Sequence, residues 1–347
     1  MKLQDLQSMT LEELEEMMSI LGEKSFRAKQ VFQWLHKHHI TEMEEMKNIP
    51  HGLRCQLEKI APLCTLELLQ KYESKKDGTT KYLFTLSDHN IIECVLMKYH
   101  HGNTVCISSQ VGCRMGCQFC ASTLEGLIRH LTPGEMLAQV YEIQKDIGER
   151  ISNIVIMGSG EPLDNFASTI VFIKNITSPL GLTIGQRHIT ISTCGLVPQM
   201  RQLALLQYQI TLAVSLHAPN DEIRKKIMPI AKKYSFEELL EACSYYIEQT
   251  NRRITFEYAL IEGCNDQEEH AKELGQKLKG LLCHINLIPM NEIAERSYKG
   301  SSLLHAQHFQ AVLQKQGIPV TIRRTLGEDI AAACGQLRRG YLLKQKS

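Results

Sequence analysis

Residues 152–157, SNIVIM, form a short apolar run that ends in the polar loop GSGEP at 158–162. A helix-like run follows at 164–178, and the next apolar run, RHITIS, covers residues 187–192. Apolar strands that alternate with helices indicate a parallel sheet whose strands are joined by crossover helices. This stretch therefore predicts one repeating unit of an α/β fold.

The same alternation continues on both sides of this stretch. The further strand-like runs are TVCISS (104–109), ITLAVSL (210–216), RITFEYALI (253–261), HINLIP (284–289) and PVTIRR (319–324). Helix-like runs lie between them, at 132–149, 197–207, 235–250, 266–280 and 302–316. About six or seven such units suit a partial or complete barrel better than a small open sheet, and a barrel has its chemical groups at the carboxyl ends of the strands.

The chain that precedes this core has a different pattern. Residues 1–70 are predicted to be helical, because Thr10-Leu-Glu-Glu13 and Thr41-Glu-Met-Glu44 have the spacing of a capping box. Residues 71–103 have a β-like pattern of alternating apolar residues. We therefore expect three parts: a small N-terminal helical accessory domain (1–70), a β-hairpin extension (71–103) and an α/β core (104–347).

The composition excludes several classes of protein. Hydrophobic residues make up 43% and charged residues 22%, which excludes wholesale disorder. No run approaches the about 18 consecutive apolar residues of a membrane helix, and the N-terminus lacks the apolar stretch of a secretory signal. We therefore expect a cytoplasmic protein that does not enter a membrane. We also expect a monomer, although the composition does not bear on this.

The chain has 12 cysteines, which in a cytoplasmic protein are not expected to form a disulfide framework. Three of them lie within eight residues, in Cys113-Arg-Met-Gly-Cys117-Gln-Phe-Cys120. Three clustered thiolates suit an iron–sulfur cluster or zinc. No second Cys-x2-Cys pair is present to complete a zinc site, which favours an iron–sulfur cluster. A [4Fe–4S] cluster with three cysteine ligands leaves one iron open for a ligand. A zinc knuckle and three packing cysteines are the alternatives.

Polar residues at the ends of successive strands are candidates for binding a ligand of this cluster. Gly160 and Glu161 offer backbone groups and a carboxylate, which can hold an ammonium group. Four neutral polar side chains are suited to ribose hydroxyls and a carboxylate, and they are Ser192, Ser215, His217 and Asn291. Loops after strands are polar in any case, so each residue is a weak signal alone. Their shared position on successive strands strengthens the prediction.

The Cys-x3-Cys-x2-Cys spacing, with the aromatic Phe119 before its last cysteine, is the signature of the radical S-adenosylmethionine (SAM) superfamily. Between about Tyr82 and Arg338 the chain resembles more closely the RlmN/Cfr family of adenosine methyltransferases. The motifs are CISSQVGCRMGCQFCAS, MGSGEPLDN, HITISTCG, SLHAPNDEIR, INLIPMN and AAACGQLR. The N-terminal module is also similar to the RNA-contacting domain of that family.

This resemblance implies a radical SAM partial (β/α)6-type TIM barrel with a [4Fe–4S] cluster and SAM as its cofactors. The implied cluster ligands are Cys113, Cys117 and Cys120. The residues implied to bind SAM are Gly160, Glu161, Ser192, Ser215, Leu216, His217 and Asn291. A low-potential electron donor such as flavodoxin or ferredoxin is implied as a partner.

The resemblance also implies a reaction that uses two SAM molecules per turnover. Adenine C2 and C8 are electron-poor carbons, so the family first methylates a protein cysteine, which here is Cys334. A 5′-deoxyadenosyl radical takes hydrogen from that methyl group, and the carbon radical adds to the base. Cys106 then releases the product by forming a disulfide with Cys334, and Glu93 matches the proposed proton acceptor.

Two residues bear on which adenine carbon is methylated. Pro162 and Val111 are similar to the RlmN branch, which makes 2-methyladenosine in 23S rRNA, at the peptidyl-transferase centre, and in tRNA, 3′ of the anticodon. Cfr-type C8 methylation of 23S rRNA, which gives antibiotic resistance, is the alternative within the family. A non-catalytic zinc- or RNA-binding protein is the alternative outside it. The chain departs from the family pattern at Ser159, usually Met, and at Ala331, usually Asp.

The net charge does not announce a nucleic-acid-binding protein, because 39 basic residues stand against 38 acidic ones. Basic residues are nevertheless concentrated in two places. One is the run of Lys71, Lys75, Lys76 and Lys81, and the other is the tail from Lys315 to Lys346. Phosphate contacts need only such local patches, so both are candidates for binding RNA.

Overall fold

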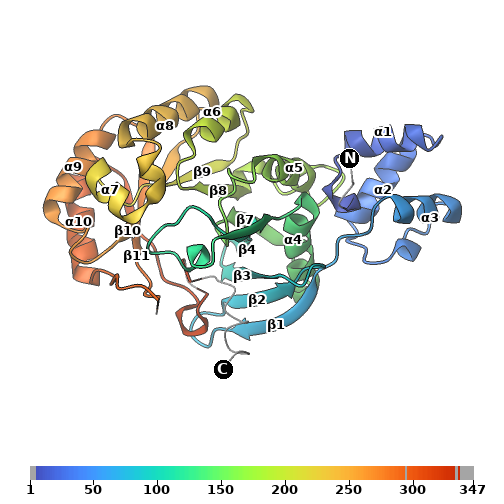
Figure 1. Cartoon of the computed structure of the whole chain (residues 1–347), viewed down its shortest axis with the longest axis horizontal. Coiled ribbons are helices and arrows are strands. Elements are labelled where there is room, and N and C mark those ends of the chain that lie inside the picture. The colour runs from blue at the N-terminus through green and yellow to red at the C-terminus, as the bar shows by residue number, and fades with distance from the viewer. Residues whose placement is uncertain (1–4, 294, 333–334, 337–347) are drawn as a thin grey trace.

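The computed structural model describes residues 5–293, 295–332 and 335–336 of the 347-residue chain. Within these residues, ten strands form one sheet in the order β1-β2-β3-β4-β7-β8-β9-β10-β11-β12, and β5 pairs with β6 in a small second sheet. Figure 1 shows the strands as an arc with helices around its outer face and the N-terminal helices at one end. The cavity described below opens at the strand ends of this arc.

Seven neighbouring strands are parallel and form the core of the fold. They are β4 (Gly102–Cys106), β7 (Ile151–Ile156), β8 (Ile189–Thr193), β9 (Thr211–Ser215), β10 (Ile254–Leu260), β11 (Cys283–Pro289) and β12 (Val320–Ile322). The helices between them are α4 (Pro133–Ile147), α5 (Phe166–Thr177), α6 (Val197–Leu205), α7 (Asp221–Ile227), α8 (Phe236–Thr250), α9 (Glu268–Leu278) and α10 (Leu303–Lys315). Because β12 is at an edge of the described sheet and does not close on β4, the barrel is partial, as expected.

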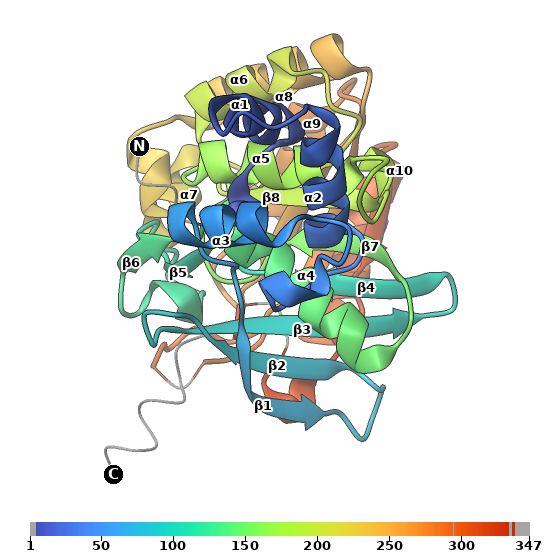
Figure 2. The same ribbon diagram turned by 90° about the vertical axis from the view of Figure 1, so that its right-hand side faces the viewer.

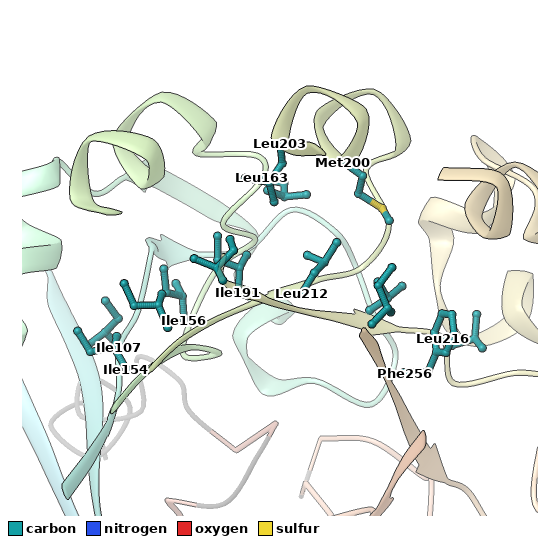
Figure 3. Packing of buried hydrophobic residues seen from close by; sticks show 14 of the residues in the cluster. Ile107, Ile154, Ile156, Leu163, Ile191, Met200, Leu203, Leu212, Leu216 and Phe256 are labelled. Atoms are coloured by element: carbon teal, nitrogen blue, oxygen red, sulfur yellow. The ribbon is translucent and has the colours of Figure 1, made fainter. Parts of the chain in front are cut away.

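Buried aliphatic side chains fix the register between the sheet and its outer helices. Ile154, Ile191 and Leu212 are fully buried on neighbouring strands, and Met200 and Leu203 of α6 pack in the same hydrophobic cluster. Figure 3 shows these side chains between the strands and the helix above them. Since burying one such side chain contributes about 1.5–3 kcal/mol, the cluster holds the strand ends that carry the site in fixed positions.

The β-rich segment before the core is an extension of the main sheet. Strands β1 (Glu67–Glu73), β2 (Thr80–Thr85) and β3 (Ile91–Tyr99) are antiparallel, and β3 pairs with β4. Figure 2 shows β1 to β4 side by side in this order. The expected β-hairpin is therefore a three-stranded continuation of the barrel sheet, which brings residues of β2 and β3 next to the first parallel strand.

The N-terminal module consists of three short helices around their own hydrophobic cluster. These are α1 (Leu11–Ile20), α2 (Phe26–His36) and α3 (His51–Ile60), with single 3-10 turns at Leu6–Ser8 and Met43–Glu45. The capping box at Thr10 is confirmed, because the Thr10 hydroxyl accepts from the backbone N–H of Glu13. The one expected at Thr41 and Glu44 is wrong, because Glu45 binds the N–H groups of Thr41 and Glu42 instead.

Polar groups attach this module to the core at the N-terminus of α4. The Asp5 carboxylate accepts a hydrogen bond of 2.9 Å from the Thr132 hydroxyl, and the Ser8 hydroxyl accepts one of 2.9 Å from the backbone N–H of Gly134. A Cβ at Gly134 would lie 2.0 Å from an Asp5 oxygen, so this close approach requires glycine. The side-chain amide of Asn175 adds bonds to backbone carbonyls of the module.

A small hairpin, which the sequence did not suggest, supports the cysteine loop. It pairs β5 (Gln110–Gly112) with β6 (Leu127–His130). The backbone N–H of Cys113 donates to the carbonyl of Gly126 over 2.9 Å. At Gly112 the backbone has φ +73°, and a Cβ there would lie 2.0 Å from that same carbonyl oxygen. The hydrogen bond between Cys113 and Gly126 therefore closes the cysteine loop at the hairpin, and this arrangement requires glycine at position 112.

Candidate active site

A cavity with an empty volume of about 960 Å³ lies at the carboxyl ends of the parallel strands. All three cysteines of the loop face it, and so do most of the strand-end residues predicted to bind SAM, which are Gly160, Glu161, Ser192, Ser215, His217 and Asn291. Leu216 does not line the cavity, because its side chain is fully buried in the main hydrophobic cluster. The structure thus brings together residues that are up to 178 positions apart, from Cys113 to Asn291.

The cysteine loop folds back on itself and over the strand ends. The backbone N–H of Cys120 donates to the carbonyl of Cys117, and the N–H of Gln118 donates to the carbonyl of Ile227 in α7. Cys113 and Cys117 are buried, and Cys120 is half-buried. Burial, with a smaller contribution from the neighbouring Cys120, raises the pKa of Cys113 to about 12. Three thiols gathered in this way need a cationic group to become thiolates together.

The residues around the loop fit an anionic cluster with thiolate ligands. Arg224 of α7 is fully buried, and its Nη1 atom has no hydrogen-bond partner in the described part of the chain. This guanidinium lies within electrostatic range of Cys117. No group of three or more His, Cys, Asp or Glu side chains among the described residues is arranged to hold a single metal ion. An iron–sulfur cluster does not need three ligands around one ion, because each of its thiolates binds a different iron. Arg224 would supply a buried positive charge near these thiolates.

Glu161 is a buried carboxylate that fixes two neighbouring backbone segments. It accepts hydrogen bonds from the N–H of Cys194 over 2.7 Å and from the N–H of Leu163 over 3.0 Å. Burial raises the pKa of Glu161, and these hydrogen bonds act in the opposite direction. Gly160 before it has φ +110°, and a Cβ there would lie 2.7 Å from the Cβ of Gln110. Glycine is therefore required for the carboxylate to reach the cavity wall.

Arg224 is a site residue that the sequence reasoning missed. Its guanidinium donates to the carbonyl oxygens of Cys194 at 2.7 Å, Leu216 at 3.3 Å and Ser215 at 3.4 Å. These carbonyls follow β8 and β9, so one side chain ties together the two strand ends that carry Ser192 and Ser215. The signal was present, because Arg224 lies inside the quoted motif SLHAPNDEIR.

His217 enters the cavity as a neutral imidazole. Its Nδ1 atom accepts from the backbone N–H of Ala259 over 2.8 Å, and burial lowers its pKa to about 3. The proton of the ring is therefore on Nε2. The ring stands edge-on to Phe119 with centroids 4.7 Å apart, which connects the strand end to the cysteine loop.

A second acidic residue, Glu257 of β10, also lines the cavity and was not predicted. Burial raises the pKa of its carboxyl, which accepts from the side-chain amide of Asn286 at 3.1 Å and lies 4.0 Å from Arg323. The sequence signal was an acid in the apolar run RITFEYALI.

Cys106 and Glu93 do not line the main cavity, and each lines another cavity. Cys106 ends β4 and shares a cavity of about 420 Å³ with Cys120 and Ser122. Glu93 of β3 lines another, of about 820 Å³, where Ser122 is again part of the wall. Because Ser122 also lines the main cavity, the three spaces adjoin at this one residue.

Cys334 lies outside the described residues, but residues on both sides of it are described. Ala332 packs in one small hydrophobic cluster with Cys106. The carbonyl of Gly335 accepts a hydrogen bond of 2.8 Å from the N–H of Ala121, next to Cys120. The described residues that flank Cys334 therefore contact the Cys106 cluster, through Ala332, and the cysteine loop, through Gly335.

Comparisons with known proteins agree with this site. The model of the radical SAM superfamily matches residues 107–274, and the model of the ribosomal RNA large subunit methyltransferase N-terminal domain matches residues 4–63. A crystal structure of a radical SAM methyltransferase from Sphaerobacter thermophilus superposes with a TM-score of 0.92 at 42% identity, over 97% of this chain and 99% of that chain. The fold and the site thus define a radical SAM enzyme.

Two curated relatives specify the family. Each is named a probable dual-specificity RNA methyltransferase RlmN. The relative from Lachnoclostridium phytofermentans is 58% identical over 97% of this chain and 95% of its own length. The relative from Alkaliphilus oremlandii is 57% identical over 97% and 98%. This chain belongs to the RlmN family of radical SAM RNA methyltransferases, and the resemblance seen in its sequence motifs is confirmed. None of the helices in the described residues is long and apolar enough to cross a membrane.

Proposed function

We propose that this protein makes 2-methyladenosine in 23S rRNA, at the peptidyl-transferase centre, and in tRNA, at the adenine 3′ of the anticodon. The observation that supports the proposal is that Ser122 lines three cavities, one with the cysteine loop on its wall, one with Cys106 and one with Glu93. The names of the relatives, which specify a dual-specificity RNA methyltransferase, support the choice of substrates.

The cofactors would occupy the main cavity. Cys113, Cys117 and Cys120 would hold a [4Fe–4S] cluster, which when bound supplies the electron that cleaves SAM. The SAM ammonium group would bind at Gly160 and Glu161, and its ribose and carboxylate at the neutral groups, which are Ser192, Ser215, His217 and Asn291. Leu216 would act only by fixing the backbone between its neighbours, since its side chain is buried away from the cavity.

The two cysteines outside the loop would carry the carbon atom to the base. Cys334 would hold the methyl group as a thioether. Cys106 would then form a disulfide with the Cys334 sulfur, and the bond between that sulfur and the product carbon would break. The presence of Ala332 in one hydrophobic cluster with Cys106 supports this pairing, because Ala332 is two residues before Cys334 in the chain. Glu93 would accept the proton that leaves the base carbon.

Methylation at C2 is preferred to methylation at C8 because Pro162 and Val111 are of the RlmN type and because the relatives carry that name. We further propose a cytoplasmic, monomeric enzyme that receives electrons from a flavodoxin or a ferredoxin. Exposed basic residues on the β1–β2 hairpin, Lys75 and Lys76 among them, would contact RNA phosphates.

The test is reconstitution with iron and sulfide without oxygen, followed by reaction with SAM, a reductant and RNA. The expected product is 2-methyladenosine, separated from 8-methyladenosine by mass spectrometry of the digested RNA. Transcripts of the 23S rRNA fragment and of tRNA test each substrate separately. A colourless protein that retains only zinc would contradict the radical SAM site, and 8-methyladenosine would contradict the choice of carbon.

A further inference from the structure

Lys81 is a buried lysine whose charged end lies next to the proposed proton acceptor. Its Nζ atom is 3.1 Å from Glu93 Oε1, and the exposed fractions of the two side chains are 9% and 5%. In the antiparallel register Leu83 of β2 pairs with Glu93 of β3, and Lys81 pairs with Val95. Lys81 and Glu93 are therefore diagonal neighbours on one face of the sheet, which lets a long side chain reach the carboxylate.

The same ammonium group also binds the segment that leads to Cys334. Lys81 Nζ donates to the carbonyl of Ala331 over 3.1 Å, and Ala331 is three residues before Cys334 in the chain. One side chain thus contacts the proposed proton acceptor and the proposed methyl-carrying segment. The basic run that includes Lys81 was expected to bind RNA, but a buried lysine cannot serve as a surface contact for phosphate.

The hairpin turn that precedes Lys81 forms two further hydrogen bonds with the segment that leads to Cys334. The Asp77 carboxylate accepts from the N–H of Gly327 over 2.9 Å, and the Ser74 hydroxyl donates to Asp329 over 2.8 Å. These bonds fix the segment at the surface, whereas the bond from Lys81 fixes it inside. The hairpin that carries Lys81 is therefore bonded to residues 327–331 both at the surface and in the interior.

A carboxylate in this place needs a positive neighbour to remain charged. The other charged groups on the wall of the Glu93 cavity are Glu125 and Glu295, and on the adjacent strand the titratable neighbour is the Cys106 thiol. Burial and negative neighbours both favour the protonated form of a carboxyl group. The Lys81 ammonium opposes both effects, and a carboxyl group that is already protonated is too weak a base to accept the proton of the base carbon.

We propose that Lys81 is a positioning residue that keeps Glu93 ionised and directs it toward the segment that carries the methyl group. The inference rests on the proposed function and deepens it. In the step concerned, the C–H bond of the base carbon breaks and its proton moves to a Glu93 oxygen. The electron pair of that bond stays in the purine ring, and the carboxylate becomes a neutral acid.

The experiment compares Lys81→Met, Lys81→Arg and the control Lys272→Met in the reconstituted full-length protein. Lys272 forms an exposed ion pair with Glu268, so its loss removes an equal charge far from the site. The rate of 2-methyladenosine formation is measured from pH 6 to pH 9 in single turnovers. We expect Lys81→Met to be about 100-fold slower at neutral pH, within the range for a general base, and to recover at high pH, where Glu93 ionises without help.

Two additional readouts separate this proposal from a merely structural role. Lys81→Met should still form 5′-deoxyadenosine and should accumulate the covalent RNA–protein adduct, while Lys81→Arg should restore turnover and the original pH profile. In a Glu93→Gln background, Lys81→Met should change the rate by less than about twofold, because residues that act through one another are not additive. This cycle remains informative where the single variant is partly destabilised.

Several outcomes would overturn the inference. They are an unchanged pH profile in Lys81→Met, a loss that Lys81→Arg does not restore, and a full additional loss in the Glu93→Gln background. Failure of the proposed function is a different result, because then the unaltered protein itself would form no 2-methyladenosine.

Discussion

The main cavity and the β2–β3 face use buried charges in different ways. At the main cavity, Glu161 of the wall and the fully buried Arg224 bind backbone groups, so both charges fix strand ends. On the β2–β3 face, the charge of Lys81 meets the side chain of Glu93 directly. Under the proposed function, the first region would hold the cofactors and the second would move a proton. Each prediction below tests one side of that division.

The largest effect is expected in the main cavity. Cys117→Ser should abolish the brown colour and the visible absorbance of the reconstituted protein, together with all methylation, because a hydroxyl is a poor cluster ligand. The control is Cys283→Ser, which changes a buried cysteine of β11 outside the cavity. A Cys117→Ser protein with a full complement of iron and normal turnover would show that the loop has another purpose.

The next effect concerns the cysteines beyond the loop. Cys106→Ala should allow the base to be attacked but not released, so a covalent RNA–protein species should be visible on a denaturing gel. Cys334→Ala should form the cluster and give neither adduct nor product. Cys94→Ala is the matched control, since the Cys94 thiol belongs to the neighbouring strand and donates to Gln139 inside the core. Free product from Cys106→Ala would exclude the two-cysteine reaction.

A smaller effect, on stability, is expected from Arg224→Met. The variant loses charged hydrogen bonds to three carbonyl groups that follow β8 and β9. We expect the free energy of unfolding in urea to fall by about 3 kcal/mol. Lys226→Met on the same helix, where the side chain is 61% exposed, should change it by less than about 0.5 kcal/mol. Equal stability of both variants would mean that the strand ends do not depend on Arg224.

The smallest effect is expected for the change in SAM affinity with pH. Because the pKa of His217 is about 3, its ring stays neutral throughout the range from pH 5.5 to pH 8. The dissociation constant for SAM should therefore vary by less than about twofold in equilibrium dialysis over that range. The unfolded chain binds a proton at His217 near pH 6.5 and the folded chain near pH 3, so stability from this residue falls as pH drops below about 6.5. A SAM affinity that depends strongly on pH would show that the charge state of His217 affects SAM binding.

Sequence reasoning succeeded where the determining interactions are local. The strand–helix alternation and the Thr10 capping box depend on neighbours a few residues away, and both are confirmed. At Thr41 the same rule failed, because Glu45 satisfies the backbone donors in a single turn. The three-residue strand β5 was not predicted, since its pairing with β6 depends on Gly112 meeting Gly126 across the cysteine loop.

The candidate site shows the same limit. The cysteine spacing is local, so Cys113, Cys117 and Cys120 were found from the sequence. Arg224 and Lys81 were not, because their roles depend on carbonyl groups of other elements, which the sequence does not show to be near them. Lys81 meets Ala331, 250 positions away. As a sequence feature it was one basic residue of a run, and only the register of β2 and β3 shows that it is turned inward.

The hydrogen bond between Ala121 and Gly335 also has a consequence for biogenesis. Roughly 200 residues separate the cysteine loop from the segment that contacts it, and synthesis at about 5–20 residues per second takes about 10–40 s to make them. During that interval the loop exists without Gly335, which is part of the cavity wall. Iron and sulfide that reach the nascent chain would thus enter a more open cavity than they would in the finished protein.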